Sequence, residues 1–161
     1  GRKCVEQGAM STRAVASAVF GVPIEVVWME LRDFRFNGKY LSTIDSVSLV
    51  EGSSGVELGA VRETKWQTGE VRHHRLLEVS DLHYRAAWEL VYANPPAEHA
   101  SKITTLRLYR ITETNSTLVE WAADFSADVS GEDIKFHHAA FLTNLVELRR
   151  ALQDKYSSEA A

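Results

Sequence analysis

The spacing of apolar residues in the first quarter of the chain predicts a strand followed by two short helices. Residues 11–20 are rich in Ala and Val without a breaker, which is typical of a strand. Pro23 follows, and proline is favoured in the first turn of a helix. The next apolar residues recur at the spacing of an amphipathic helix: Ile24, Val27, Trp28, Leu31 and Phe34. A second short helix or turn is expected around Tyr40, Leu41 and Ile44.

The middle of the chain changes to the patterns of strands. Six segments are typical of strands: residues 46–51, 60–67, 71–79, 84–93, 102–112 and 117–127. Turn-forming residues separate them, for example Thr68-Gly69 and Asn94-Pro95-Pro96. Because most of these connections are short, consecutive strands are expected to pair as antiparallel hairpins rather than through helical crossovers.

The last segment returns to helical spacing. Its stripe of inward-facing positions steps by three and four residues: Ile134, His138, Phe141, Leu145, Leu148 and Leu152. Ser130 is a suitable cap, acidic residues follow it, and basic residues lie at the far end, as the helix dipole favours. The pattern predicts one helix of about twenty residues with a polar tail, residues 156–161, behind it.

These elements together predict an α+β domain. A curved antiparallel sheet of about seven strands cannot bury its own concave face. Only the C-terminal helix is long enough to cover that face, with two short helices between strands 1 and 2. A sheet wrapped around one helix can leave an apolar cavity between them.

Composition and charge narrow the class of protein. The chain has 161 residues, and 45% of them are hydrophobic. Its formal net charge is −4, so it is a poor candidate for binding the phosphate backbone of a nucleic acid. It contains no apolar run long enough to cross a membrane. Its single cysteine, Cys4, and an N-terminus without a signal-peptide pattern favour a cytoplasmic protein. We expect a single domain over residues 11–155, with flexible tails at 1–10 and 156–161.

Several short motifs resemble those of one superfamily. They are Val22-Pro23 through Trp28, Gly59-Ala60-Val61-Arg62, His74-Arg75-Leu76 before the turn at Ser80-Asp81, Glu120-Trp121 with Phe125, and the closing helix over 139–152. In this order they resemble the Bet v 1-like (START-like, SRPBCC) superfamily and its polyketide cyclase/dehydrase-like subgroup. The resemblance covers residues 12–152 and implies a helix-grip fold. It also implies an internal cavity, although His74 stands where family members commonly carry Glu.

Strand alternation selects the residues that could wall such a cavity. Arg62, Thr64 and Trp66 share one face of a strand, and Trp88, Leu90 and Tyr92 share one face of another. These faces are either the wall of a ligand pocket or ordinary core. The residues predicted to bind a ligand are Arg62, Trp66, His74, Trp88, Tyr92, Trp121, Phe125, His138 and Phe141.

Two of these residues carry polar chemistry that needs an explanation. A cationic Arg62 on an inner face must be stabilised in one of three ways. It pairs with a carboxylate of the protein, reaches solvent at the entrance of the cavity, or contacts a carboxylate or carbonyl of a ligand. His138 interrupts an apolar stripe, so it is either a core histidine bonded to backbone or a base in the pocket. The six histidines lack metal-ligand spacing, and no nucleophile or dinucleotide motif is present, so we predict neither a metal nor a cofactor.

The predicted function is binding of a hydrophobic small molecule, such as a lipid, sterol, polyketide or aromatic metabolite, in a cavity between the sheet and the last helix. One alternative is an enzyme similar to polyketide cyclases, aromatases or dehydratases, with Arg62 stabilising an enolate and His74 or His138 moving a proton. A protein-interaction module is a third alternative, and it would have no internal cavity. We predict no nucleic-acid partner and no integral membrane association, while the oligomeric state stays open.

Overall fold

The computed structural model describes residues 12–160. In chain order the described residues form β1 (Arg13–Phe20), α2 (Ile24–Leu31), α3 (Phe36–Tyr40), β2 (Ile44–Glu51), β3 (Val61–Trp66), β4 (Val71–Ser80), β5 (Arg85–Asn94), β6 (Lys102–Ile111), β7 (Ser116–Phe125) and α4 (Gly131–Ala160). The predicted order of a strand, two short helices, six strands and a long helix is confirmed. The tail predicted at residues 1–10 lies outside the described residues.

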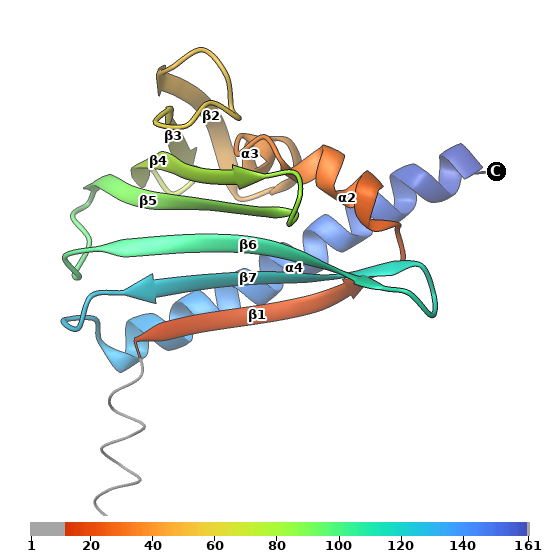
Figure 1. The fold of residues 1–161 in the computed structure, drawn as a ribbon. Coiled ribbons are helices and arrows are strands. Elements are labelled where there is room, and N and C mark those ends of the chain that lie inside the picture. The colour runs from red at the N-terminus through yellow and green to blue at the C-terminus, as the bar shows by residue number, and fades with distance from the viewer. Residues whose placement is uncertain (1–11, 161) are drawn as a thin grey trace, which may run out of the picture.

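All seven strands belong to one antiparallel sheet in the order β1-β7-β6-β5-β4-β3-β2 (Figure 1). From β2 to β7 each strand pairs with the next along the chain, as short connections require. The tight β3–β4 turn, for example, is closed by a hydrogen bond from the Trp66 amide to the Glu70 carbonyl, and Gly69 supplies a φ of 92° there. β1 pairs along its whole length with β7, so the first strand lies beside the last.

The two short helices differ in their bounds from the pattern in the sequence. The first ends at Leu31 rather than near Phe34, because the Asp33 carboxylate accepts a hydrogen bond of 2.9 Å from the Arg35 amide and turns the chain. The second therefore begins at Phe36, and Ile44 is already the first residue of β2.

The C-terminal helix is longer than its apolar stripe predicts, because the segment expected to be a polar tail is helical up to Ala160. No breaker follows the stripe, and polar side chains just before this segment attach the helix to the first part of the chain. Gln153 Oε1 accepts a hydrogen bond from the Gly21 amide, and Lys155 forms an ion pair with Glu30. At the other end, Ser130 Oγ accepts a hydrogen bond from the Asp133 amide, as predicted for a cap.

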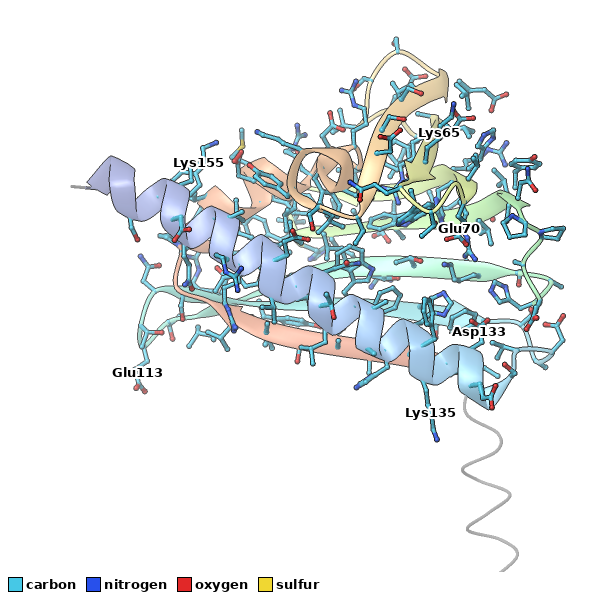
Figure 2. The ribbon with its side chains drawn as sticks, turned by 180° about the vertical axis from the view of Figure 1, so that it is seen from behind. Lys65, Glu70, Glu113, Asp133, Lys135 and Lys155 are labelled. Carbon is cyan, nitrogen blue, oxygen red and sulfur yellow. The ribbon has the colours of Figure 1, made fainter. Side chains whose placement is uncertain are left out.

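α4 crosses one face of the sheet diagonally (Figures 1 and 2). Its second half buries Leu145, Leu148 and Leu152 completely, and it packs along β1 and β7. The small side chains of Ala14 and Ala16 on β1 let the helix approach closely. The architecture is the predicted α+β helix-grip fold: a curved seven-stranded antiparallel sheet around a long C-terminal helix.

Candidate functional site

A cavity of about 420 Å³ lies between the sheet and the first half of α4. This volume falls in the range of small-molecule sites. β3 to β7 form its floor, the first half of α4 covers it, and α3 with the chain leading into β2 closes one side. The residues that line it are Asn37, Leu41, Thr43, Ile44, Arg62, Trp66, Thr68, Glu70, Arg72, His74, Trp88, Lys102, Thr104, Trp121, Phe136, His137, Ala140, Phe141, Thr143 and Asn144.

Aromatic rings form much of the wall. Trp121 stacks on Phe141 with ring centroids 5.5 Å apart, and Trp88 meets Trp121 edge-on at 6.4 Å. The Trp121 indole N–H is buried and has no hydrogen-bond partner among the described residues. A buried indole N–H normally has a partner, so it is available to an acceptor on a ligand.

Arg62 is 96% buried, since its exposed fraction is 4%, and within the described residues no carboxylate lies within ion-pair distance of it. Its Nη1 donates a hydrogen bond to the Phe34 carbonyl, and its guanidinium lies 5.0 Å from the Phe34 ring and 4.8 Å from the Trp88 ring. Nε has no partner. Burial lowers the pKa of Arg62 to about 9, and nearby Asp33 opposes the shift.

His74 is the direct cross-strand partner of Arg62. Burial is the main cause that lowers its pKa well below the usual value, and the charge of Arg62 adds to the effect. The imidazole is therefore neutral at pH 7. Its Nδ1 is buried and has no hydrogen-bond partner in the part of the chain that the structure describes, so the inner face carries a second polar atom open to a ligand.

Lys102, at the start of β6, is also buried, with 6% of its surface exposed. Its Nζ lies 3.4 Å from His137 Nε2, and the described residues place no carboxylate within ion-pair distance. Burial is the largest cause that lowers the pKa of Lys102 to about 7. The charges of Arg72 and Arg62 lower it further, while Asp133 and Glu70 oppose the shift.

The His137 tautomer follows from its two neighbours. Nδ1 lies 2.8 Å from the Asp133 carbonyl oxygen and 3.3 Å from the Asp133 carboxylate, so it carries the hydrogen and donates it. Nε2 is then an acceptor facing the Lys102 ammonium. Burial is the main cause that lowers the pKa of His137 to about 4, which keeps this ring neutral.

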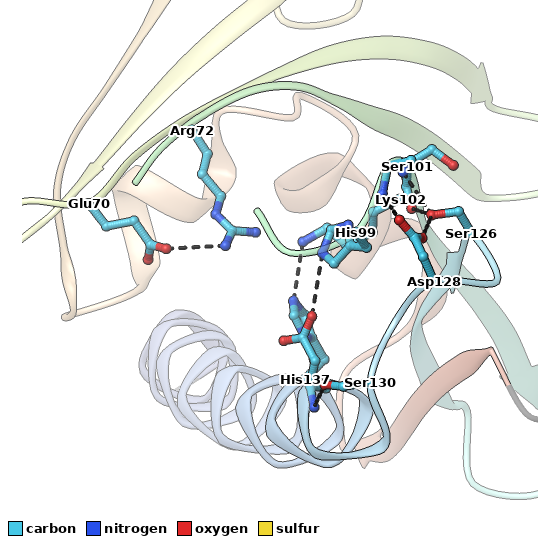
Figure 3. Close-up of polar contacts among 11 residues, drawn as sticks. Glu70, Arg72, His99, Ser101, Lys102, Ser126, Asp128, Ser130 and His137 are labelled. Atoms are coloured by element: carbon cyan, nitrogen blue, oxygen red, sulfur yellow. Dashed lines mark hydrogen bonds and ion pairs between the residues drawn. The ribbon is translucent and has the colours of Figure 1, made fainter. Parts of the chain in front are cut away.

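Arg72 of β4 and Lys102 of β6 approach the region above His137 of α4 (Figure 3). Arg72 pairs with Glu70, with 3.2 Å between Nη2 and Oε2. His99, from the β5–β6 connection, closes this end of the site, where its Nε2 lies 3.5 Å from the Asp133 carboxylate. Two cationic side chains, Arg72 and Lys102, therefore meet at this end of the cavity, with Glu70 and Asp133 as the nearby carboxylates.

Six of the nine predicted site residues line the cavity: Arg62, Trp66, His74, Trp88, Trp121 and Phe141. Phe125 is buried but does not line it. Its ring meets the rings of His99 and His137 edge-on, with centroids 5.0 Å from each, and of these two histidines His137 lines the cavity.

Tyr92 does not lie on the inner face as alternation predicts. His73 pairs with Tyr92 whereas His74 pairs with Leu90, so β5 has a bulge at Val91. The extra residue reverses the alternation beyond it. Tyr92 is 48% exposed and its ring contacts His73 on the outer face.

The placement of His138 on the inward stripe is wrong, because His138 is exposed and the adjacent His137 faces the sheet. Either histidine lies within one helical turn of Phe141, so spacing alone allows both. The helix rotation that buries Phe141 and Leu145 selects His137, four residues before Phe141.

Sequence reasoning missed the cationic residues Arg72 and Lys102. The signal was present: Arg72 alternates with His74 and Leu76, and Lys102 alternates with Thr104 and Leu106. A charged residue at a strand end is usually solvated, so the pattern was not decisive for either of them.

The described residues contain no group of three or more His, Cys, Asp or Glu side chains that could hold a metal ion. Over the same part of the chain, no helix is both long and apolar enough to span a bilayer.

Comparison with known proteins gives a family-level match. Residues 11–154 match the family described as polyketide cyclase/dehydrase and lipid transport. No curated protein matches the chain significantly.

Solved structures match nearly the whole chain. A protein from Nitrosospira multiformis has 24% identity and a TM-score of 0.79, covering 90% of this chain and 99% of its own. The protein XoxI from Bacillus cereus has 26% identity and a TM-score of 0.77, covering 91% and 99%. Ara h 8.0201 has 12% identity and a TM-score of 0.72, covering 88% and 97%, and shows the shared fold alone.

Proposed function

Because the chain belongs to the polyketide cyclase/dehydrase and lipid transport family of the Bet v 1-like superfamily, we propose that it binds a hydrophobic small molecule in its internal cavity. The ligand would lie between the inner face of the sheet and the first half of α4. The six predicted residues that line the cavity, with Arg72, Lys102 and His137, would contact it. Phe125 would act by supporting His137, and neither Tyr92 nor His138 would contact the ligand.

One observation carries this proposal: an aromatic-lined hollow of about 420 Å³ inside an otherwise closely packed protein. Native interiors rarely leave such a volume unless something occupies it. Burying apolar ligand surface there contributes ~25 cal/mol per Å². The unpartnered N–H of Trp121 and Nδ1 of His74 supply polar contacts that would orient the ligand. The protein-interaction alternative expects a filled interior and does not account for this volume.

Filling the cavity tests the proposal. N-phenyl-1-naphthylamine, a neutral aromatic probe, fluoresces more strongly in apolar surroundings. Wild type should bind it saturably, and Ala140→Trp should weaken binding at least tenfold because Ala140 lines the cavity. The matched control is Ala139→Trp, which adds the same ring at an exposed neighbouring position outside the cavity lining. Absence of saturable binding, or equal binding by wild type and Ala140→Trp, would contradict the proposal.

A second candidate function is proton-transfer catalysis similar to that of polyketide cyclases. The observation that favours it is Lys102, a buried amine whose pKa is lowered to about 7, because a general base or acid works best near the pH of operation. His74 and His137 are poorer candidates, since both have pKa values well below neutrality.

Deuterium exchange at the acidic carbon of 1-phenyl-1,3-butanedione, followed by NMR, tests catalysis. An enzyme should accelerate the exchange, and Lys102→Met should abolish the acceleration while the exposed Lys135→Met retains it. Exchange at the buffer rate with the wild-type protein would leave binding as the proposed function.

A further inference from the structure

The charges around the cavity do not balance. Its lining carries three cationic side chains, Arg62, Arg72 and Lys102, but only one carboxylate, Glu70. That carboxylate is 3.2 Å from Arg72 and is already paired. Burying a cation without a counter-charge costs free energy, so a ligand that brings negative charge to this lining would be stabilised.

Lys102 is one of two cations in the lining, with Arg62, that have no carboxylate within ion-pair distance among the described residues. It is 94% buried, since only 6% of its surface is exposed, and its ammonium group faces the neutral ring of His137 at 3.4 Å. The hydrogen on His137 Nδ1 is directed to Asp133, so this ring accepts a hydrogen bond but provides no negative charge. Two hydrogens of the ammonium group have no acceptor among the described residues.

Arg72 and Lys102 also repel each other. Among neighbouring charges, that of Arg72 has the largest effect on the Lys102 pKa, and it lowers it. The two side chains come from β4 and β6 toward one region, beside His137 (Figure 3). An anion in that region would be attracted by both cations and would accept the free hydrogens of Lys102.

The cation at the other end of the cavity is less suited to an incoming anion. The Arg62 guanidinium lies against the rings of Phe34 and Trp88 and donates to the Phe34 carbonyl, so rings and backbone occupy much of its surface. Between the two ends the wall is apolar and aromatic, with Trp121 stacked on Phe141. The cavity thus combines a site for one anionic group with a surface for an apolar body.

We propose that the ligand is an amphiphilic anion, with one carboxylate or comparable anionic group bound between Lys102 and Arg72 and an apolar, ring-sized body against Trp121 and Phe141. This inference rests on the proposed function and specifies the chemistry of its ligand. The anion supplies a negative charge within ion-pair distance of Lys102, where the described residues place none; Asp133 and Glu70 act on Lys102 only from farther away.

Two probes that differ by one anionic group test this inference. The probe 8-anilinonaphthalene-1-sulfonate is N-phenyl-1-naphthylamine with an added sulfonate. In wild type the anionic probe should bind at least tenfold tighter than the neutral one. Lys102→Met keeps the length of the side chain and removes its charge. It should weaken binding of the anionic probe at least tenfold more than it weakens binding of the neutral probe.

The matched control is Lys135→Met, which removes the same charge from an exposed position near the start of α4 (Figure 2). Neither probe should change its affinity more than twofold with this variant. Neutral-probe binding by Lys102→Met shows that the variant is folded with its cavity intact. Equal affinity of wild type for the two probes, or an unchanged affinity of Lys102→Met for the anionic probe, would overturn the inference while the neutral probe still supports the proposed function. Binding of neither probe by wild type would overturn both.

Discussion

The inner face of the sheet has two halves that the same helix covers in different ways. Along β1 and β7, the second half of α4 fills the space with fully buried leucines, Leu145, Leu148 and Leu152. Over β3 to β7, the first half of α4 covers a cavity lined by tryptophans and buried cations. One half therefore has the packing and composition of a core, whereas the other has the volume and polar groups of a binding site.

The packed half and the hollow half of the inner face differ in the size of their side chains, while the backbone fold is continuous across both. Small residues on β1, Ala14 and Ala16, bring the helix close to one edge of the sheet. On β3 and β5, the large side chains of Arg62 and Trp88 contact each other. Stability and binding therefore depend on different residues: the packed half stabilises the fold, and the hollow half is available to a ligand.

Truncating a leucine in the packed half should have the largest effect. Leu148→Ala removes a completely buried side chain and should lower the free energy of unfolding by ~2–5 kcal/mol. Leu142→Ala, on the same helix but 44% exposed, should lower it by less than about 0.5 kcal/mol. Urea denaturation measures both values. Similar losses for the two variants would contradict the division of α4 into these faces.

Removing the buried charge from the hollow half should instead stabilise the protein. The folded pKa of Lys102 is about 7 against an unfolded value of 10.5, so between these pH values the unfolded chain binds more protons and wild-type stability rises with pH. At pH 6 the penalty is fully present, and Lys102→Met should raise the free energy of unfolding by ~1–4 kcal/mol.

The gain should shrink as the pH rises from 7 toward 10, because wild type then folds with a neutral Lys102. Urea denaturation of both proteins at pH 6, 7.5 and 9 measures it. A gain that is constant across this range would show that the Lys102 ammonium is not buried at a cost.

Adding a large ring should distinguish filled space from empty space. Ala14→Trp places an indole in the packed half, where Ala14 is 1% exposed, and should destabilise the protein by ~1–3 kcal/mol. Ala140→Trp places it in the cavity and should cost less than about 1 kcal/mol. Thermal unfolding compares the two, and a greater loss for Ala140→Trp would indicate that the hollow is not open to an indole.

The two adjacent histidines of α4 give the smallest expected effect. His137→Ala should weaken binding of 8-anilinonaphthalene-1-sulfonate several-fold, because it removes the acceptor that orients Lys102. His138→Ala should leave the affinity unchanged within twofold, because His138 is exposed. Fluorescence titration compares the variants, and a larger effect at His138 would contradict the observed rotation of the helix.

Much of the fold could be predicted because it depends on local patterns. The leucine stripe fixed the inward side of α4 from Phe141 onward, and short turns required hairpins. The features that could not be predicted depend on one-residue differences, either an extra residue in a strand or a choice between two adjacent positions on a helix. The bulge at Val91 moved Tyr92 to the outer face, and no pattern distinguished His137 from His138. The tail predicted at residues 156–161 is helical up to Ala160, and the helix just before it makes a long-range contact, from the Gly21 amide to Gln153, that the sequence does not display.

The candidate site was only partly visible for a related reason. Aromatic residues on strand faces indicated a wall, and Trp88 and Trp121 do line the cavity. Buried cations run against the expectation that charges are solvated, so Arg72 and Lys102 became candidates only when the strands were placed beside α4. The excess of positive charge at the cavity is seen only when Arg72 and Lys102, which are far apart in the sequence, lie close together in the fold.

The most direct test of the central claim is a titration of ¹⁵N-labelled protein with 8-anilinonaphthalene-1-sulfonate, followed by backbone amide shifts. Ligand binding in the cavity should give saturable changes in β3 to β7 and in the first half of α4, with little change around Leu148 and Leu152. Changes confined to the outer face of the sheet, or an absence of saturable changes, would contradict it.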